Sequence, residues 1–156
     1  YDSSLLIGDD KYQLLEFHYH SPSEHTIDGN TYAMEVHLVH KNSAGNLAVV
    51  GVLLRIGKKS TVLQKILDNV TKQAAPTVAH PEILINAGDL LPQAASVFHY
   101  TGSLTTPPCN ENVNWYLMAD TQTVSREEVE KFQRLIGKNA RPTQPLNWRS
   151  VMVSQP

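Results

Sequence analysis

The segment EFHYH at residues 16–20 decides the fold, because its side chains alternate as they would on the two faces of a β-strand. His18 and His20 stand at positions i and i+2 and therefore point to the same side. The alternation extends over Tyr12–His20, which we predict to be one strand with Leu14 on the face of the histidines. Two histidines alone are a weak sign of a metal site, so the neighbouring segments matter.

A second alternating segment, EVHLVH at residues 35–40, lies within another predicted strand, Tyr32–His40. The Asp28-Gly29 pair before it is typical of a tight turn, which favours an antiparallel pairing of the two strands. That pairing would bring His37 beside the two histidines of the first strand. Three neutral imidazoles leave one position open on a zinc ion, as in catalytic rather than structural zinc sites.

The remaining pattern predicts one mainly β domain with a few helices. Leu47–Ile56 is an apolar run typical of a strand that is buried on both faces. Helical spacing of apolar residues predicts helices at Thr61–Val70 and Ser125–Ile136, and the second begins with a capping-box sequence. Gln73–Pro92 is punctuated by prolines and predicts a long surface excursion. Leu104–Pro108 ends in two prolines and predicts a stiff, non-helical loop.

Composition excludes several classes of function. The 156 residues are 41% hydrophobic and can bury a sizeable core. The net charge of −2 lacks the basic balance of proteins that bind nucleic acid or anionic membranes. No apolar run is long enough to span a bilayer, and no segment has the pattern of a signal peptide. The single cysteine, Cys109, has no partner in this chain.

Two glutamates strengthen the interpretation as a metal site. Glu16 and Glu35 each precede a candidate ligand by two residues and share its face. Metal-bound imidazoles usually donate their second N–H to a carboxylate or a carbonyl, which these side chains could supply. Without such a use, burying this set of polar groups would be costly. We interpret His25 and His40 as structural, hydrogen-bonded histidines.

A cupin-type site is an alternative explanation for some of the same residues. His18-x-His20-x-x-x-Glu24 matches the first half of the cupin motif, in which two histidines and a glutamate bind a divalent ion inside a jelly-roll barrel. The glycines that flank that motif are not at their places, and no later Pro-x-Gly-x-x-His segment follows. A motif match without its context is weak.

The chain resembles the α-class carbonic anhydrases in four separated segments that occur in the order of that family. They are EFHYH at 16–20, SEHTIDG at 23–29, EVHLVH at 35–40 and SLTTPPC at 103–109. NARPTQPL at 139–146 also fits, so the similarity covers almost the whole chain. The resemblance implies a central, mostly antiparallel sheet with a few peripheral helices. It also implies zinc-dependent, reversible hydration of carbon dioxide to bicarbonate and a proton.

The resemblance implies a zinc site with defined ligands. His18, His20 and His37 correspond to the three residues that bind Zn²⁺. Glu35 corresponds to the carboxylate that accepts a hydrogen bond from His37. Glu16 stands where many family members have glutamine, and a carboxylate there would raise the basicity of His18.

The resemblance also implies how the substrate is held. Thr105 corresponds to the threonine that accepts a hydrogen bond from zinc-bound hydroxide and donates its own to a glutamate, here Glu24. This pair would orient the hydroxide for attack on carbon dioxide. The residues implied to bind the substrate are an apolar wall of Val39, Val49, Leu104 and Trp115, with Thr106 at its polar edge.

The sequence departs from the family in what precedes the first ligand. Only seventeen residues come before His18, whereas family members have roughly the first third of the domain there. We therefore expect residues 1–156 to be the C-terminal portion of one longer domain, without its proton shuttle. Many secreted and periplasmic members have a disulfide for which Cys109 occupies the second position, so such a location is expected. The alternative function is a fragment that binds zinc but is inactive.

Overall fold

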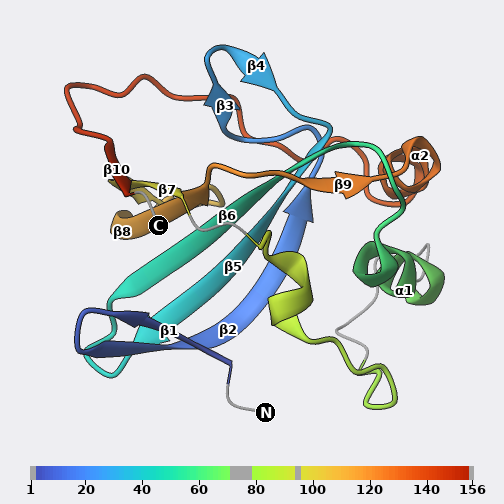
Figure 1. Ribbon diagram of the computed structural model, residues 1–156, viewed down its shortest axis with the longest axis horizontal. Helices are drawn as coiled ribbons and strands as arrows, with labels where there is room; N and C mark the ends of the chain where they lie inside the picture. Colours follow the sequence, from blue (N-terminus) through green and yellow to red (C-terminus); the bar gives the residue numbers. More distant parts are fainter. Residues whose placement is uncertain (1–2, 71–78, 94–95, 155–156) are drawn as a thin grey trace.

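The computed structural model describes residues 3–70, 79–93 and 96–154, and strands dominate it (Figure 1). The strands are β1 (Ser4–Ile7), β2 (Asp10–His20), β3 (Thr26–Ile27), β4 (Asn30–Thr31), β5 (Met34–Asn42), β6 (Leu47–Ile56), β7 (Val97–Ser103), β8 (Glu111–Met118), β9 (Gln122–Val124) and β10 (Met152–Ser154). The helices are α1 (Thr61–Asn69), the 3₁₀ helix η1 (Ala87–Leu90) and α2 (Arg126–Leu135).

The main sheet has the strand order β1-β2-β5-β6-β8-β7-β10, and β9 pairs with β6 as well. Within the described strands, every pairing of this sheet is antiparallel except those of β8 and β9 with β6. Figure 1 shows the sheet curling, with α1 and α2 together at one end. The predicted mainly β fold with a mostly antiparallel sheet is thereby confirmed.

The register of β2 against β5 places the histidines. His18 pairs directly with His37 across the two antiparallel strands, as the alternation predicted. The register shifts between Leu14 and Glu16, which marks a β-bulge. Leu14 therefore packs with the core on the other side of the sheet, while Leu15 lies beside the histidines. The prediction for the face of Leu14 was wrong, because a bulge reverses the parity of the residues before it.

The predicted turn at Asp28-Gly29 is present, but it closes a separate hairpin. Both residues have positive φ, 51° and 75°, as a two-residue turn that follows the twist of the strands requires. The turn joins the short strands β3 and β4, which pair only with each other. The connection from β2 to β5 is therefore longer than a tight turn, and it carries Glu24 and His25.

The two faces of the central strands serve different purposes. On one face Val36 and Leu38 of β5 join a large core with β6 and both α-helices. On the other face a smaller cluster forms around Val39, Val49 and Trp115. The alternation of β5 thus directs Met34, Val36 and Leu38 into the large core and places His37 and Val39 on the opposite face.

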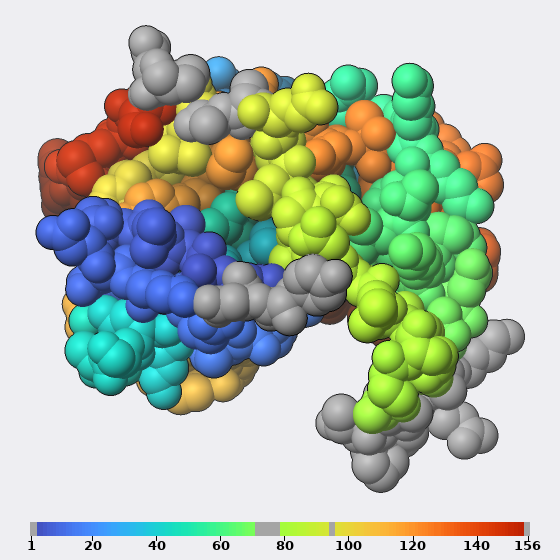
Figure 2. Space-filling view, turned by 60° about the horizontal axis from the view of Figure 1, so that its bottom comes forward, coloured from blue at the N-terminus to red at the C-terminus, as the bar shows by residue number. Residues whose placement is uncertain are grey.

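Residues 79–93, which come between α1 and β7 in sequence, cross the surface, as Figure 2 shows in yellow-green. Ala87 and Leu90 of η1 are buried and fix this segment to the large core. The prediction of a surface excursion over Gln73–Pro92 holds for the part of that segment from residue 79 onward, and residues 71–78 lie outside the described residues. No described helix is long and apolar enough to cross a membrane.

Glu128 ties the two α-helices together. Ser125 caps α2, and Glu128 completes the predicted capping box by accepting a bond of 2.7 Å from the Ser125 N–H. The same carboxylate accepts the Ser60 N–H at 3.1 Å, at the start of α1. The side chain is buried, so its loss would leave two backbone donors without this partner.

We expect Glu128→Ala to lower the free energy of unfolding by about 1–3 kcal/mol, the usual cost of leaving buried donors unsatisfied. Urea unfolding followed by circular dichroism measures the change. Glu130→Ala, at an exposed position of the same helix, should change the free energy by no more than about 0.5 kcal/mol. Equal effects of the two substitutions would contradict the role of Glu128 in joining the helices.

Candidate metal centre

Three imidazoles meet on the face of the sheet opposite the large core. His18 and His20 come from β2, and His37 comes from the neighbouring β5. Their ring centroids are 4.6–5.3 Å apart, and one nitrogen of each lies within 4.8 Å of the others. Three such nitrogens at this spacing can surround one metal ion.

Each of these imidazoles has one nitrogen beside an oxygen acceptor. The Nδ1 of His18 lies 3.0 Å from Glu16 Oε1, and the Nε2 of His37 lies 2.8 Å from Glu35 Oε1. The Nδ1 of His20 lies 3.2 Å from Glu24 Oε1. The second nitrogen of each ring, which is Nε2 of His18 and His20 and Nδ1 of His37, remains available for a metal.

The Nε2 of His20 provides a test of whether a metal fits. This atom is buried and has no hydrogen-bond partner among the described residues. An unsatisfied buried polar atom is costly, and a metal ion would satisfy it. Burial, and then the charge that His37 would carry, lower the pKa of His20. The neutral imidazole, which has the lone pair that a metal needs, is therefore favoured near neutral pH.

Glu35 is fully buried and accepts four hydrogen bonds. His25 Nδ1 lies 2.6 Å and His37 Nε2 lies 2.8 Å from its Oε1. The backbone N–H groups of Glu24 and His25 donate to its Oε2, each at 2.9 Å. Burial acts to raise the pKa of Glu35, but the charge and hydrogen bonds of the two histidines hold it below its usual value. Glu35 is therefore an ionised carboxylate that accepts a hydrogen bond from each ring.

A cavity of about 240 Å³ opens beside the three imidazoles. It is lined by all five residues predicted to bind substrate (Val39, Val49, Leu104, Thr106 and Trp115), together with Leu15, Glu16, His18, His37, Leu47 and Thr105. Trp115 donates its indole N–H to the Ser103 carbonyl at 3.0 Å, which leaves its ring as part of the wall. Sequence reasoning missed Leu47, although it has the same parity as Val49 on β6.

Glu24 and Thr105 approach the same region from different elements. Glu24 Oε1 accepts the Arg141 N–H at 2.7 Å, while its Oε2 is buried and has no partner among the described residues. No hydrogen bond joins Thr105 to Glu24 within the described part of the chain. The predicted pairing of the two therefore stays a prediction, and the free Oε2 is the atom that could accept the threonine hydroxyl.

The C-terminal segment fixes the end of β2. The Asn139 side chain accepts the Ser21 N–H and donates to the Tyr19 carbonyl, each at 2.9 Å. The backbone carbonyl oxygen of Asn139 lies 3.4 Å from His20 Nδ1. These contacts hold the strand that carries two of the candidate ligands. Their only signal in the sequence was the resemblance of residues 139–146 to the family.

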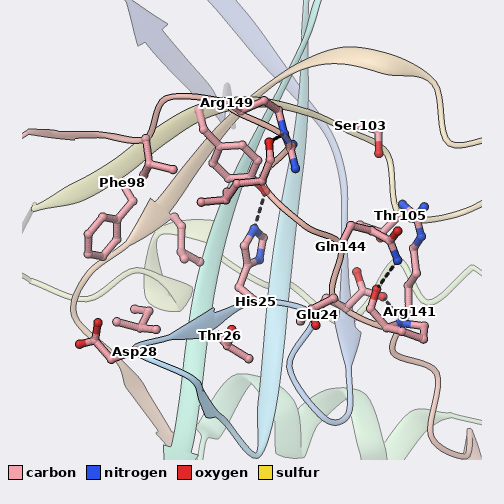
Figure 3. Close-up of a pocket in the computed structure, with 17 residues that line it drawn as sticks. Glu24, His25, Thr26, Asp28, Phe98, Ser103, Thr105, Arg141, Gln144 and Arg149 are labelled. Carbon is pink, nitrogen blue, oxygen red and sulfur yellow. Dashed lines mark hydrogen bonds between the residues drawn. The ribbon is translucent and has the colours of Figure 1, made fainter.

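A second cavity, of about 430 Å³, lies next to the Glu24 and Thr105 side chains (Figure 3). His25 also lines it, and a dashed line in Figure 3 marks its hydrogen bond of 2.6 Å to the Tyr100 hydroxyl. His25 is thus hydrogen-bonded, as its interpretation as a structural histidine expected. Its second partner is Glu35, so it also contacts the surroundings of the metal centre.

Comparisons with known proteins agree with this geometry. A carbonic anhydrase of Nostoc sp. is 43% identical over 96% of this chain and 57% of its own length. The α-carbonic anhydrase of Thermovibrio ammonificans, solved with the inhibitor sulfanilamide, has a TM-score of 0.89 and 39% identity over 94% of this chain and 65% of its own. Dioscorin, solved with ascorbate, has a TM-score of 0.89 and 32% identity over 97% of this chain and 66% of its own.

The chain spans little more than half the length of the Nostoc relative. The expectation that residues 1–156 are the C-terminal portion of one longer domain stays a prediction. The cupin alternative is wrong, because the sheet and the relatives are those of a different family. Residues 3–155 match the model of the eukaryotic-type carbonic anhydrases, and the chain therefore belongs to that family.

Proposed function

We propose that this chain supplies the zinc site for the reversible hydration of carbon dioxide to bicarbonate and a proton. His18, His20 and His37 would hold Zn²⁺ through the nitrogens that face away from their carboxylate neighbours. The observation that carries the proposal is the buried, unpartnered Nε2 of His20, which lies in a cluster of three imidazoles beside a mainly apolar cavity. Family membership supports the same reaction.

Zinc, when bound, supplies a nucleophile by lowering the pKa of a coordinated water to about 7, for which carbonic anhydrase is itself the standard example. The protein side chains provide the rest. Carbon dioxide is neutral and apolar, so a wall of Val39, Val49, Leu104 and Trp115 would admit and position it. Thr105 would orient the nucleophile by donating a hydrogen bond from its hydroxyl to Oε2 of Glu24, which has no partner among the described residues.

The carboxylates around the imidazoles would prepare them for the metal. Glu35 holds the proton of His37 on Nε2 and so leaves the lone pair on Nδ1. Glu16 accepts from Nδ1 of His18 at the more exposed side of the site. Carboxylate partners of this kind raise the basicity of a ligand and fix the orientation of its ring.

The test uses the 156-residue chain. We expect stoichiometric zinc by elemental analysis and a rate of carbon dioxide hydration that a sulfonamide abolishes. Zinc at stoichiometric level with no inhibitable rate would favour the alternative, a fragment that binds zinc but is inactive. Zinc far below stoichiometry would contradict the metal site itself.

A periplasmic or secreted location belongs to the same proposal. It rests on the resemblance of the Cys109 segment to secreted and periplasmic family members. Fractionation of the source cells, with an antibody against the chain, tests it. Recovery of the protein with cytoplasmic markers alone would contradict the location and leave the proposed reaction unaffected.

A further inference from the structure

A continuous chain of hydrogen bonds runs from β7 to a candidate metal ligand. The Tyr100 hydroxyl lies 2.6 Å from Nε2 of His25, in the connection between β2 and β5. Nδ1 of His25 lies 2.6 Å from Glu35 Oε1, and the same oxygen lies 2.8 Å from Nε2 of His37. Tyr100 is thus connected to the candidate ligand His37 by hydrogen bonds through two intervening side chains, His25 and Glu35.

The chemistry of the groups fixes the direction of each proton in this chain. Glu35 is a carboxylate and can only accept, so both imidazoles must donate to it. A neutral His25 that carries its proton on Nδ1 has a lone pair on Nε2. This nitrogen can only accept a hydrogen bond, so the Tyr100 hydroxyl is the donor. Burial, and then the negative charge of Glu35, raise the pKa of Tyr100 and keep its hydroxyl protonated.

Packing leaves the Tyr100 ring little freedom to move. The ring stacks on Trp115 at 6.2 Å and an interplanar angle of 7°, and the Arg149 guanidinium lies 5.5 Å above it. A Cβ at Gly102 would lie only 2.8 Å from Tyr100 Cε2. The backbone can therefore come this close to the ring only because residue 102 is glycine. The hydroxyl is therefore presented to His25 by a ring that is held on several sides.

We propose that Tyr100 is a positioning residue of the metal centre, whose hydroxyl holds His25 in the tautomer that fixes Glu35 and thereby orients His37 toward the metal. This inference rests on the proposed function and adds to it a residue of β7 far from the ligands in sequence. Outer partners of metal ligands commonly contribute to metal affinity. Tyr100 would do so from two contacts beyond Glu35.

Tyr100→Phe removes only the hydroxyl and retains the ring that stacks on Trp115. We expect the zinc dissociation constant of the 156-residue chain to rise about 10-fold, at the low end of the range for outer partners of a ligand. Competition with a chromophoric chelator measures the constant. The absorption spectrum of the Co²⁺-substituted chain should change in shape, because the orientation of one ligand changes.

Tyr116→Phe is the matched control. Tyr116 lies on the adjacent strand β8 and stacks on His99 at 4.5 Å, away from the chain of hydrogen bonds. Its substitution should leave the zinc constant and the Co²⁺ spectrum as in the unmodified chain. Equal zinc constants for the two variants would overturn the positioning role. So would a loss of zinc affinity that merely follows a lower unfolding temperature of the metal-free Tyr100→Phe chain.

A double-substitution cycle tests the order of the contacts. If Tyr100 acts through Glu35, Tyr100→Phe should cost much less zinc affinity when Glu35→Gln is already present. Additive effects of the two substitutions would contradict the inference. Failure of the inference is distinct from failure of the proposed function, because the unmodified chain then still binds zinc and hydrates carbon dioxide. An unmodified chain that binds no zinc would overturn both.

Discussion

Replacing His37 with alanine is expected to reduce zinc affinity by more than about 100-fold and to remove the proposed hydration activity with it. Loss of an outer partner of a ligand already costs 10–100-fold, and this substitution removes the ligand atom itself. It also leaves the carboxylate of Glu35, which is fully buried, without one of its two side-chain donors. Elemental analysis and chelator competition measure the effect on zinc.

His40→Ala separates metal binding from packing. His40 lies three residues further along the same strand, is also buried, and its Nδ1 lies 2.9 Å from the Leu38 carbonyl. It is not among the three clustered imidazoles. We expect this variant to lose stability but to keep stoichiometric zinc. A His37→Ala chain that is folded by circular dichroism and binds zinc with unchanged affinity would contradict the metal site.

The central strands could be predicted because their signal is local. β2, β5 and β6 alternate or are continuously apolar, and the observed β6 has the predicted bounds, Leu47–Ile56. The pairing of β6 with β8 could not be read from the sequence. It joins residues near position 49 to residues near position 115, in parallel, and no turn between them sets the register. The edge strands β1 and β10 are too short to show a period.

The grouping of the three histidines was also predictable, since parity within a strand and one antiparallel pairing are enough to bring them together. The contacts around them were not. His25 reaches Tyr100 across 75 positions of sequence, and His20 reaches Asn139 across 119. The bulge between Leu14 and Glu16 has no marker in the sequence either, yet it decides that Leu15 lines the cavity.

The fold alone does not identify the ligand of this site. Dioscorin, solved with ascorbate, has the same TM-score to this chain as the Thermovibrio carbonic anhydrase. The particular side chains must therefore carry the functional argument. Here three free imidazole nitrogens and an apolar cavity of about 240 Å³ suit a metal and a small neutral substrate. Substitutions that separate metal binding from catalysis are the sharper test.

Thr105→Val should produce that separation. The substitution keeps the shape of the side chain but removes the hydroxyl that would orient the nucleophile. Misplacement of a reacting group by about 1 Å can cost 10²-fold in rate, so we expect hydration to slow by about 100-fold. Zinc affinity should change little, because Thr105 is neither one of the clustered imidazoles nor one of their carboxylate partners. Stopped-flow measurement of proton release gives the rate.

The contrast with Thr101→Val makes the result specific. Thr101 lies on β7 and is exposed, so the same chemical change there should leave both rate and zinc content unaltered. An unchanged rate in Thr105→Val would mean that the hydroxyl does not orient the nucleophile. A slowed rate with full zinc content would instead support the role of the hydroxyl and its predicted hydrogen bond to Glu24, whose buried Oε2 has no partner among the described residues. Glu24→Gln in the Thr105→Val background should then add little further loss, since the two side chains would act as one unit.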